Sequence, residues 1–221
     1  MAQKHALIAG ATGLVGGEVL QELIRGRQYH TITLLTRREV DTNSKRVENL
    51  IVDFDDFTAD DLPEVDDVFC CLGTTIKKAG SKEAFKQVDY HYPLKLAPLS
   101  LKRGAQQYLL VSAMGADKNS RIFYNQVKGE VEEAVASEGF KTLHIFRPSI
   151  LLGERDEQRF GEQIAQIAMQ GVAPVMVGNF KKYRPIEAYD IAKAMVHVAK
   201  KELEGTFVFE SDKIQALAKL S

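Results

Sequence analysis

The sequence predicts a doubly wound α/β protein, in which one parallel sheet carries helices on both faces. Short apolar runs alternate along the chain with longer amphipathic runs. Strands that are apolar throughout and separated by helices are typical of a parallel sheet covered on both faces. A glycine-rich turn joins the first such strand to the first helix. We therefore expect a single domain over residues 1–221, with a small C-terminal appendage on the substrate side at about residues 150–190.

Seven strands are expected from short apolar and β-branched runs. The continuous apolar character of most of them is what predicts their burial between two helical layers. In chain order, the expected strands are His5–Ala9, Thr31–Leu35, Asn49–Asp53, Val68–Leu72, Tyr108–Val111, Thr142–Phe146 and Thr206–Phe209.

The helices are expected where apolar residues recur at a helical spacing. In chain order, they are Leu14–Ile24, Lys82–Leu101, Arg121–Ala136, Phe160–Met169 and Ile214–Leu220. The first one shows the pattern clearly, because Val15, Val19, Leu20, Leu23 and Ile24 share one face. After Pro148 the pattern becomes irregular, and the sequence indicates a segment that could cover a pocket.

Composition and charge limit the class of protein. The chain has 221 residues, 29 Lys plus Arg and 30 Asp plus Glu, and so a formal net charge of −1. Balanced charge argues against nucleic acid as a partner, since such binders carry a basic surface. The longest uncharged stretch, residues 163–180, is rich in glutamine and glycine, so no integral membrane segment is expected. Cys70 and Cys71 are the only cysteines, which fits a reducing compartment and predicts a cytoplasmic protein.

The strongest motif lies at the first strand–helix turn and reads Gly10, Ala11, Thr12, Gly13, Leu14, Val15 and Gly16. In such a turn one glycine permits the tight bend, one lets a pyrophosphate approach the backbone, and one lets the helix pack on the strand. The position of the motif in a βαβ pattern predicts a dinucleotide site. The alternative is a glycine-rich turn with no ligand.

The residues that follow the next strands indicate which dinucleotide binds. Arg37 and Arg38 stand where an NAD site often has a carboxylate, and a guanidinium can hold a 2′-phosphate. This favours NADP(H) over NAD(H), unless both arginines are merely solvated. Asp53, with Phe54 beside it, could accept a hydrogen bond from adenine. The segment 72–74 (Leu72, Gly73 and Thr74) would let backbone pass close to the dinucleotide.

Ser112, Tyr124 and Lys128 are the candidate catalytic residues. Tyr124 and Lys128 are four apart on an expected helix and share a face, and Ser112 follows the fifth strand. A tyrosine at this edge can donate a proton to a carbonyl that receives hydride, with a lysine cation lowering its pKa. Ser112 would bind the substrate oxygen. Tyr189 and Lys193 repeat the spacing without a comparable serine, and the alternative reading of Tyr124 is a packing residue.

Together these motifs resemble the short-chain dehydrogenase/reductase superfamily, and more closely its atypical branch of Tat-interacting-protein-like oxidoreductases. The resemblance rests on segments 10–16, 69–75, 78–80, 88–90, 115–118, 124–132 and 146–148. It implies a Rossmann fold, an NADP(H) site and a Ser-Tyr-Lys centre in which Lys128 bonds the nicotinamide ribose. It also implies that Arg147, Pro148 and Ser149 line the nicotinamide end. Asp89 stands where many members carry an active-site Asn, which questions the usual proton-relay water chain.

The sequence therefore predicts an NADP(H)-dependent oxidoreductase that transfers hydride to or from a small carbonyl or alcohol substrate. A non-catalytic NADP(H)-binding redox sensor or regulatory protein, with a protein partner, is the alternative. A nucleotide-sugar epimerase is disfavoured by the short C-terminal region. No metal site is expected, because the five histidines lack ligand spacing. Substrate and oligomeric state stay open, and the residues that could reach the substrate are Glu154, Arg155, Tyr183 and Arg184.

Overall fold

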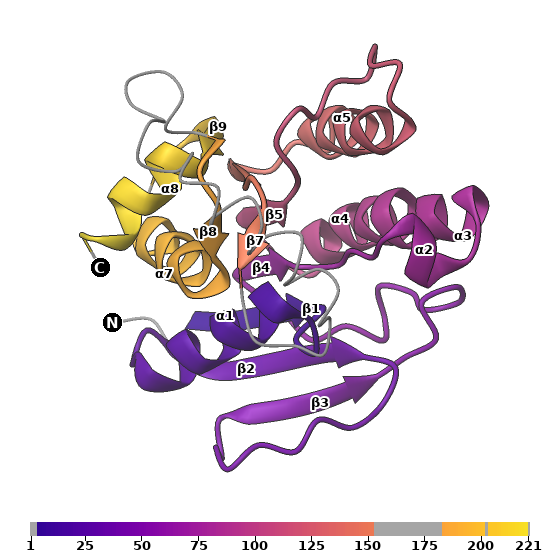
Figure 1. Ribbon diagram of the computed structural model, residues 1–221. Coiled ribbons are helices and arrows are strands. Elements are labelled where there is room, and N and C mark those ends of the chain that lie inside the picture. The colour runs from indigo at the N-terminus through magenta and orange to yellow at the C-terminus, as the bar shows by residue number, and fades with distance from the viewer. Residues whose placement is uncertain (1–3, 153–182, 202, 221) are drawn as a thin grey trace.

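One parallel sheet organises the chain (Figure 1). The structure is a computed structural model, and it describes residues 4–152, 183–201 and 203–220. Seven strands hydrogen-bond in the order β3-β2-β1-β4-β5-β6-β9. Their bounds are β1 Lys4–Ala9, β2 Tyr29–Thr36, β3 Val47–Ile51, β4 Asp67–Cys70, β5 Gln107–Val111, β6 Thr142–Arg147 and β9 Gly205–Glu210. All neighbouring pairs in this sheet are parallel, as the continuous apolar runs predict.

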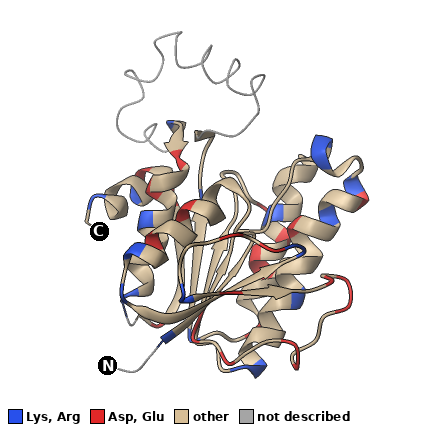
Figure 2. Cartoon of the chain, turned by 90° about the horizontal axis from the view of Figure 1, so that it is seen from below, with Lys and Arg blue, Asp and Glu red and all other residues tan. Residues whose placement is uncertain are grey.

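Helices cover both faces of the sheet (Figures 1 and 2). Helices α1 (Leu14–Arg25), α7 (Ala188–Ala199) and α8 (Ser211–Ala218) pack together on one face. Helices α4 (Tyr92–Lys102) and α5 (Phe123–Ala136) cover the other face. Strand β1 contributes to the hydrophobic core on each face of the sheet, because Ile8 packs on the α1 side and Leu7 packs on the α4 side. The doubly wound α/β class is thus confirmed.

The strand order reverses between β1 and β4, and this reversal positions the site. Strand β1 pairs with β2 on one side and with β4 on the other. In open parallel sheets, ligands bind outside the carboxyl ends of the strands at such a point. The turns that follow β1, β4 and β5 meet at this edge, and they contain the glycine motif, residues 71–75 and Ser112.

The long helix expected at residues 82–101 is interrupted by a π-helical turn. It consists of α3 (Lys82–Lys86), the π turn η1 (Gln87–His91) and α4. Pro93 is the second residue after the turn, and it lacks the N–H that an α-helix would bond to the Asp89 carbonyl. Single π turns inside helices frequently mark functional sites. This one carries Asp89, whose side chain it buries.

The remaining differences are shifted element ends and a few elements that the sequence pattern did not indicate. Strand β3 begins two residues before the expected strand, in register with β2. Sequence patterning missed α2 (Ile76–Ala79), all of α7, and the parallel pair β7 (Leu151–Leu152) and β8 (Ile186–Glu187). The helix expected at 160–169 lies outside the described residues, as does most of the expected substrate-side segment.

Candidate active site

The glycine turn after β1 is closed so tightly that only glycine fits at two of its positions. Gly10 has φ +88°, and a Cβ there would lie 2.5 Å from the Cys71 carbonyl oxygen. A Cβ on Gly16 would lie 2.2 Å from the Gly10 carbonyl oxygen. The turn therefore holds the start of α1 against the ends of β1 and β4.

The start of α1 fits a phosphate group. The N-cap is Gly13, which has no side chain to bond the first N–H groups of the helix. The first turn of α1 contains no acidic residue. The first N–H groups of a helix lack intrahelical partners and carry a partial positive charge. Phosphates bind at helix ends of this kind. The residues present thus suit the pyrophosphate of a dinucleotide.

The candidate ribose and adenine residues lie beyond the ends of β2 and β3. Arg37 and Arg38 are both exposed, and the Thr36 hydroxyl donates to the Arg38 carbonyl oxygen at 2.8 Å. Asp53 is exposed and accepts a hydrogen bond from the Asp55 N–H at 2.9 Å. Phe54 is buried in the core on the α4 side. Two guanidinium groups are therefore available at the end of β2, whereas Asp53 stabilises a turn.

Lys128 forms a buried ion pair with Asp89, the residue that stands at the expected Asn position. Its Nζ lies 2.7 Å from Asp89 Oδ1, and the two side chains are only 5% and 1% exposed. The second Asp89 oxygen, Oδ2, accepts the Thr74 N–H at 2.9 Å. Gly73 lies over the pair, since a Cβ there would be 3.5 Å from Asp89 Oδ1 and 3.8 Å from Lys128 Nζ. The expected Asn position thus holds a charged partner for the lysine.

Tyr124 lies one helical turn before Lys128 on α5, with its ring against the Phe85 ring at a centroid distance of 5.5 Å. Burial raises the pKa of Tyr124, the Lys128 cation opposes that rise, and the Asp89 carboxylate adds to it. Burial is the largest influence on Lys128 and disfavours its charge, but Asp89, Tyr124 and Cys70 together outweigh burial and raise the pKa of Lys128. We conclude that Lys128 is charged and Tyr124 is protonated at neutral pH.

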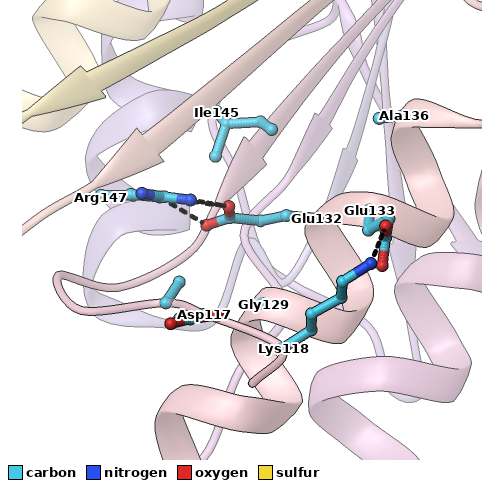
Figure 3. A pocket seen from close by; sticks show the side chains of 9 residues that line it. Asp117, Lys118, Gly129, Glu132, Glu133, Ala136, Ile145 and Arg147 are labelled. Carbon is cyan, nitrogen blue, oxygen red and sulfur yellow. Dashed lines mark hydrogen bonds and ion pairs between the residues drawn. The ribbon is translucent and has the colours of Figure 1, made fainter. Parts of the chain in front are cut away.

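Ser112 is buried, and its hydroxyl donates to Glu132 rather than facing open space. Glu132 also pairs with Arg147 through Nε–Oε1 at 3.0 Å and Nη2–Oε2 at 2.5 Å (Figure 3). The hydrogen bond to Glu132 raises the pKa of Arg147. Sequence reasoning missed Glu132, although it follows Lys128 by four residues on α5, and that spacing could have indicated it.

A surface pocket of about 560 Å³ lies beside this network (Figure 3). It is lined by α5, by β6 and by residues 116–118, and Glu132 and Arg147 form part of its wall. The segment 117–118 crosses α5 at Gly129, where a Cβ would lie 2.2 Å from the Lys118 nitrogen. Glu133 pairs with Lys118 at the same pocket, through exposed side chains.

The end of β6 connects to the C-terminal part of the chain. Ser149 donates its N–H to the Ser211 hydroxyl oxygen at 2.7 Å and its hydroxyl to the Arg184 carbonyl oxygen. The Pro148 carbonyl oxygen accepts the Met114 N–H at 2.9 Å. These contacts hold residues 147–149 beside the loop that follows Ser112. Their contact with a nicotinamide stays a prediction.

The second Tyr-x-x-x-Lys pair has a different setting. Tyr189 is 42% exposed, and the Lys193 Nζ lies 5.2 Å from its ring centroid. Both stand on α7, which packs with α1 across the sheet from α5. Of the candidate substrate residues, Tyr183 is exposed and Arg184 is half-buried, whereas Glu154 and Arg155 lie outside the described residues.

Comparisons with known proteins show which proteins this chain is similar to. A family described as "NAD dependent epimerase/dehydratase family" matches residues 6–208. The rat protein named HTATIP2 is 40% identical over 171 residues, which cover 75% of this chain and 70% of the rat protein. "Protein FMP52, mitochondrial" from Candida albicans is 34% identical over 212 residues, 90% of this chain and 89% of that protein. The structure titled "MoeE5 in complex with UDP-glucose and NAD" shares the fold, with a TM-score of 0.70 at 14% identity, over 98% of this chain and 82% of that one.

The expected cytoplasmic localisation is wrong in the light of these relatives. The proteins from Candida albicans and Eremothecium gossypii are both named mitochondrial. The expectation rested on Cys70 and Cys71, which are free in the structure. Free thiols indicate a reducing environment but do not identify the compartment. Within the described part of the chain, no helix is both long and apolar enough to cross a bilayer.

Proposed function

The chain belongs to the NAD dependent epimerase/dehydratase family, and we propose that it is an NADP(H)-dependent oxidoreductase acting on a small carbonyl or alcohol substrate. The observation that carries the proposal is the arrangement on α5. Tyr124 and Lys128 share one face of this helix, and each affects the pKa of the other. Ser112 follows the neighbouring strand β5, at the same edge of the sheet as the glycine turn.

The preference for NADP(H) is proposed from the end of β2. Arg37 and Arg38 are exposed there and could bind a 2′-phosphate through paired, charge-assisted hydrogen bonds. The glycine turn and the start of α1 would hold the pyrophosphate. Asp53 would accept from adenine, and Gly73 and Thr74 would line the path of the dinucleotide.

In the proposed reaction, the bound nicotinamide supplies or accepts the hydride. In the direction of reduction, Tyr124 gives its hydroxyl proton to the substrate oxygen as the carbonyl carbon gains the hydride. In the direction of oxidation, the Tyr124 oxygen takes the proton back from the alcohol. Lys128 has three N–H donors, so one can stay with Asp89 while others reach a ribose hydroxyl.

Calorimetric titration of cofactor-free protein with NADPH and NADH tests the cofactor part of the proposal. We expect Arg37→Ala or Arg38→Ala to weaken NADPH binding by about tenfold or more, since a charge-assisted hydrogen bond is lost. NADH lacks the 2′-phosphate, so its binding should stay the same. Arg27→Ala is the matched control, because Arg27 is exposed but precedes β2 at the opposite edge of the sheet. Equal weakening of both cofactors would contradict the assignment of these arginines.

A second candidate is a non-catalytic NADP(H)-binding regulator. One observation favours it: Ser112 is already bonded to Glu132 and Lys128 to Asp89, so two of the three candidate residues have partners within the chain. Turnover that depends on Tyr124 would exclude this candidate. NADPH binding without turnover of any aldehyde, ketone or quinone would support it.

A further inference from the structure

The Asp89–Lys128 ion pair is almost completely buried, with only 1% and 5% of the two side chains exposed. Asp89 comes from the π turn η1, and Lys128 comes from α5. The Thr74 N–H fixes one Asp89 oxygen at 2.9 Å, while the other lies 2.7 Å from the Lys128 ammonium. The ammonium end of the Lys128 side chain is therefore held in one position. A buried pair of this kind leaves an uncompensated charge if either partner is removed.

The pair is also the source of the charges that act on Tyr124. Tyr124 lies one turn before Lys128 on α5, so its side chain shares a helix face with the lysine that pairs with Asp89, and its ring packs on Phe85. Among the described residues, Lys128 and Asp89 are the charged groups that affect the pKa of Tyr124. Lys128 is faced by Asp89 from η1, by Tyr124 from its own helix and by the Cys70 thiol from β4. Since Asp89 and Lys128 carry opposite charges, their effects on Tyr124 oppose each other.

We propose that Asp89 is a positioning residue, which holds the Lys128 ammonium in place and offsets its charge at the Tyr124 hydroxyl. This inference rests on the proposed function for its meaning in catalysis. With the pair intact, the Tyr124 hydroxyl keeps its proton and is ready to act as the acid in carbonyl reduction. An Asn at position 89 would leave the lysine charge uncompensated and favour the phenolate.

The experiment measures ionisation of Tyr124 directly, without cofactor or substrate. Ultraviolet absorbance is followed as the pH is raised, and each protein is compared with its own Tyr124→Phe counterpart, so that the difference isolates Tyr124. Asp89→Asn should increase the Tyr124 ionisation constant by about tenfold or more, because a nearby cation acts alone. Lys128→Met should decrease it, because the carboxylate then acts alone.

The double variant Asp89→Leu with Lys128→Met removes both charges and provides a well-packed apolar replacement. Its Tyr124 should titrate between the two single variants. Asp61→Asn, at an exposed carboxylate that accepts from Thr58, is the control and should leave the titration unchanged. A purely structural role for Asp89 predicts shifts of the same sign in all destabilised variants. Shifts of equal sign in the two single variants would therefore overturn the proposal.

The outcome is separable from that of the proposed function. Opposite shifts in a protein that binds neither cofactor would support the role of Asp89 at Tyr124 while rejecting the oxidoreductase. Normal NADPH turnover in Asp89→Asn, with an unchanged pH profile and an unchanged Tyr124 titration, would reject the role of Asp89 and leave the oxidoreductase standing.

Discussion

The Ser112 hydroxyl donates its only hydrogen to the carboxylate of Glu132. A serine hydroxyl has one donor and two acceptor positions, so Ser112 has acceptor positions left for another group. Glu132 is itself fixed by two guanidinium nitrogens of Arg147. Helix α5 therefore carries Tyr124, Lys128 and the residue that orients Ser112 on successive turns.

Glu132→Gln should lower the free energy of unfolding by about 2 to 3 kcal/mol, because it breaks a largely buried pair and leaves Arg147 without its counterion. The side chain of Glu132 is 6% exposed, and that of Arg147 is 28% exposed. The neighbouring Glu133→Gln removes a pair whose side chains are 60% and 50% exposed. Its effect should stay below about 1 kcal/mol. Urea unfolding of both variants measures the difference, and similar losses would show that Glu132 is not a stabilising partner.

The parts of the site that were predictable from the sequence are those encoded locally. The glycine turn needs three glycines within seven residues, and a close approach such as that of Gly16 to Gly10 follows from the turn itself. Tyr124 and Lys128 are brought together by the helical repeat alone. Such short-range relationships are visible without knowing how the helices pack.

The rest depends on contacts between distant segments. Asp89 meets Lys128 only because a π turn rotates the helix before α4, and nothing in apolar periodicity indicates that turn. Ser112 meets Glu132 only because α5 packs beside β5. Helix α7 is an exception, because Asp190, Lys193 and His197 recur along one face and the apolar residues on its other side are buried, so its helical pattern was present in the sequence.

Gly16→Ala should destabilise the protein by about 3 kcal/mol, because the new Cβ would meet the Gly10 carbonyl oxygen at 2.2 Å. The adjacent Gly17→Ala is the matched control. A Cβ there meets nothing closer than the Ala11 carbonyl oxygen at 3.6 Å, so the substitution should stabilise α1 by about 0.5 to 1 kcal/mol. Thermal unfolding with and without NADPH gives both values. Opposite signs for the two neighbours are the expected result, and a neutral Gly16→Ala would contradict this packing of the turn.

His144 should make the fold sensitive to acid. It is fully buried on β6, with the Phe207 and Phe209 rings at centroid distances of 5.5 and 5.9 Å, and neither ring nitrogen has a hydrogen-bond partner among the described residues. Burial lowers the pKa of His144 to about 4, against an ordinary value of 6.5. Between these values the unfolded chain binds a proton that the folded chain does not. The folded state therefore has its full stability above pH 6.5, and its free energy of unfolding falls by about 3 kcal/mol as the pH approaches 4.

His144→Leu removes this titration, so its unfolding free energy should vary less between pH 6.5 and 4 than that of the wild type. His30→Gln, at an exposed histidine, is the control and should keep the wild-type slope. Urea unfolding at several pH values measures both slopes. If His144→Leu kept the wild-type slope, the acid sensitivity would have to come from other groups.

Tyr124→Phe should reduce turnover by about 100-fold or more, since a general acid contributes that much to proton transfer. NADPH oxidation with a panel of aldehydes, ketones and quinones is the assay. The chain offers its own control in Tyr189→Phe, which alters the same residue type in the same Tyr-x-x-x-Lys spacing, on the exposed surface of α7. Both variants should bind NADPH as the wild type does, because neither phenol is assigned to the phosphates. Equal turnover in the two variants would remove Tyr124 from the reaction and favour binding without catalysis.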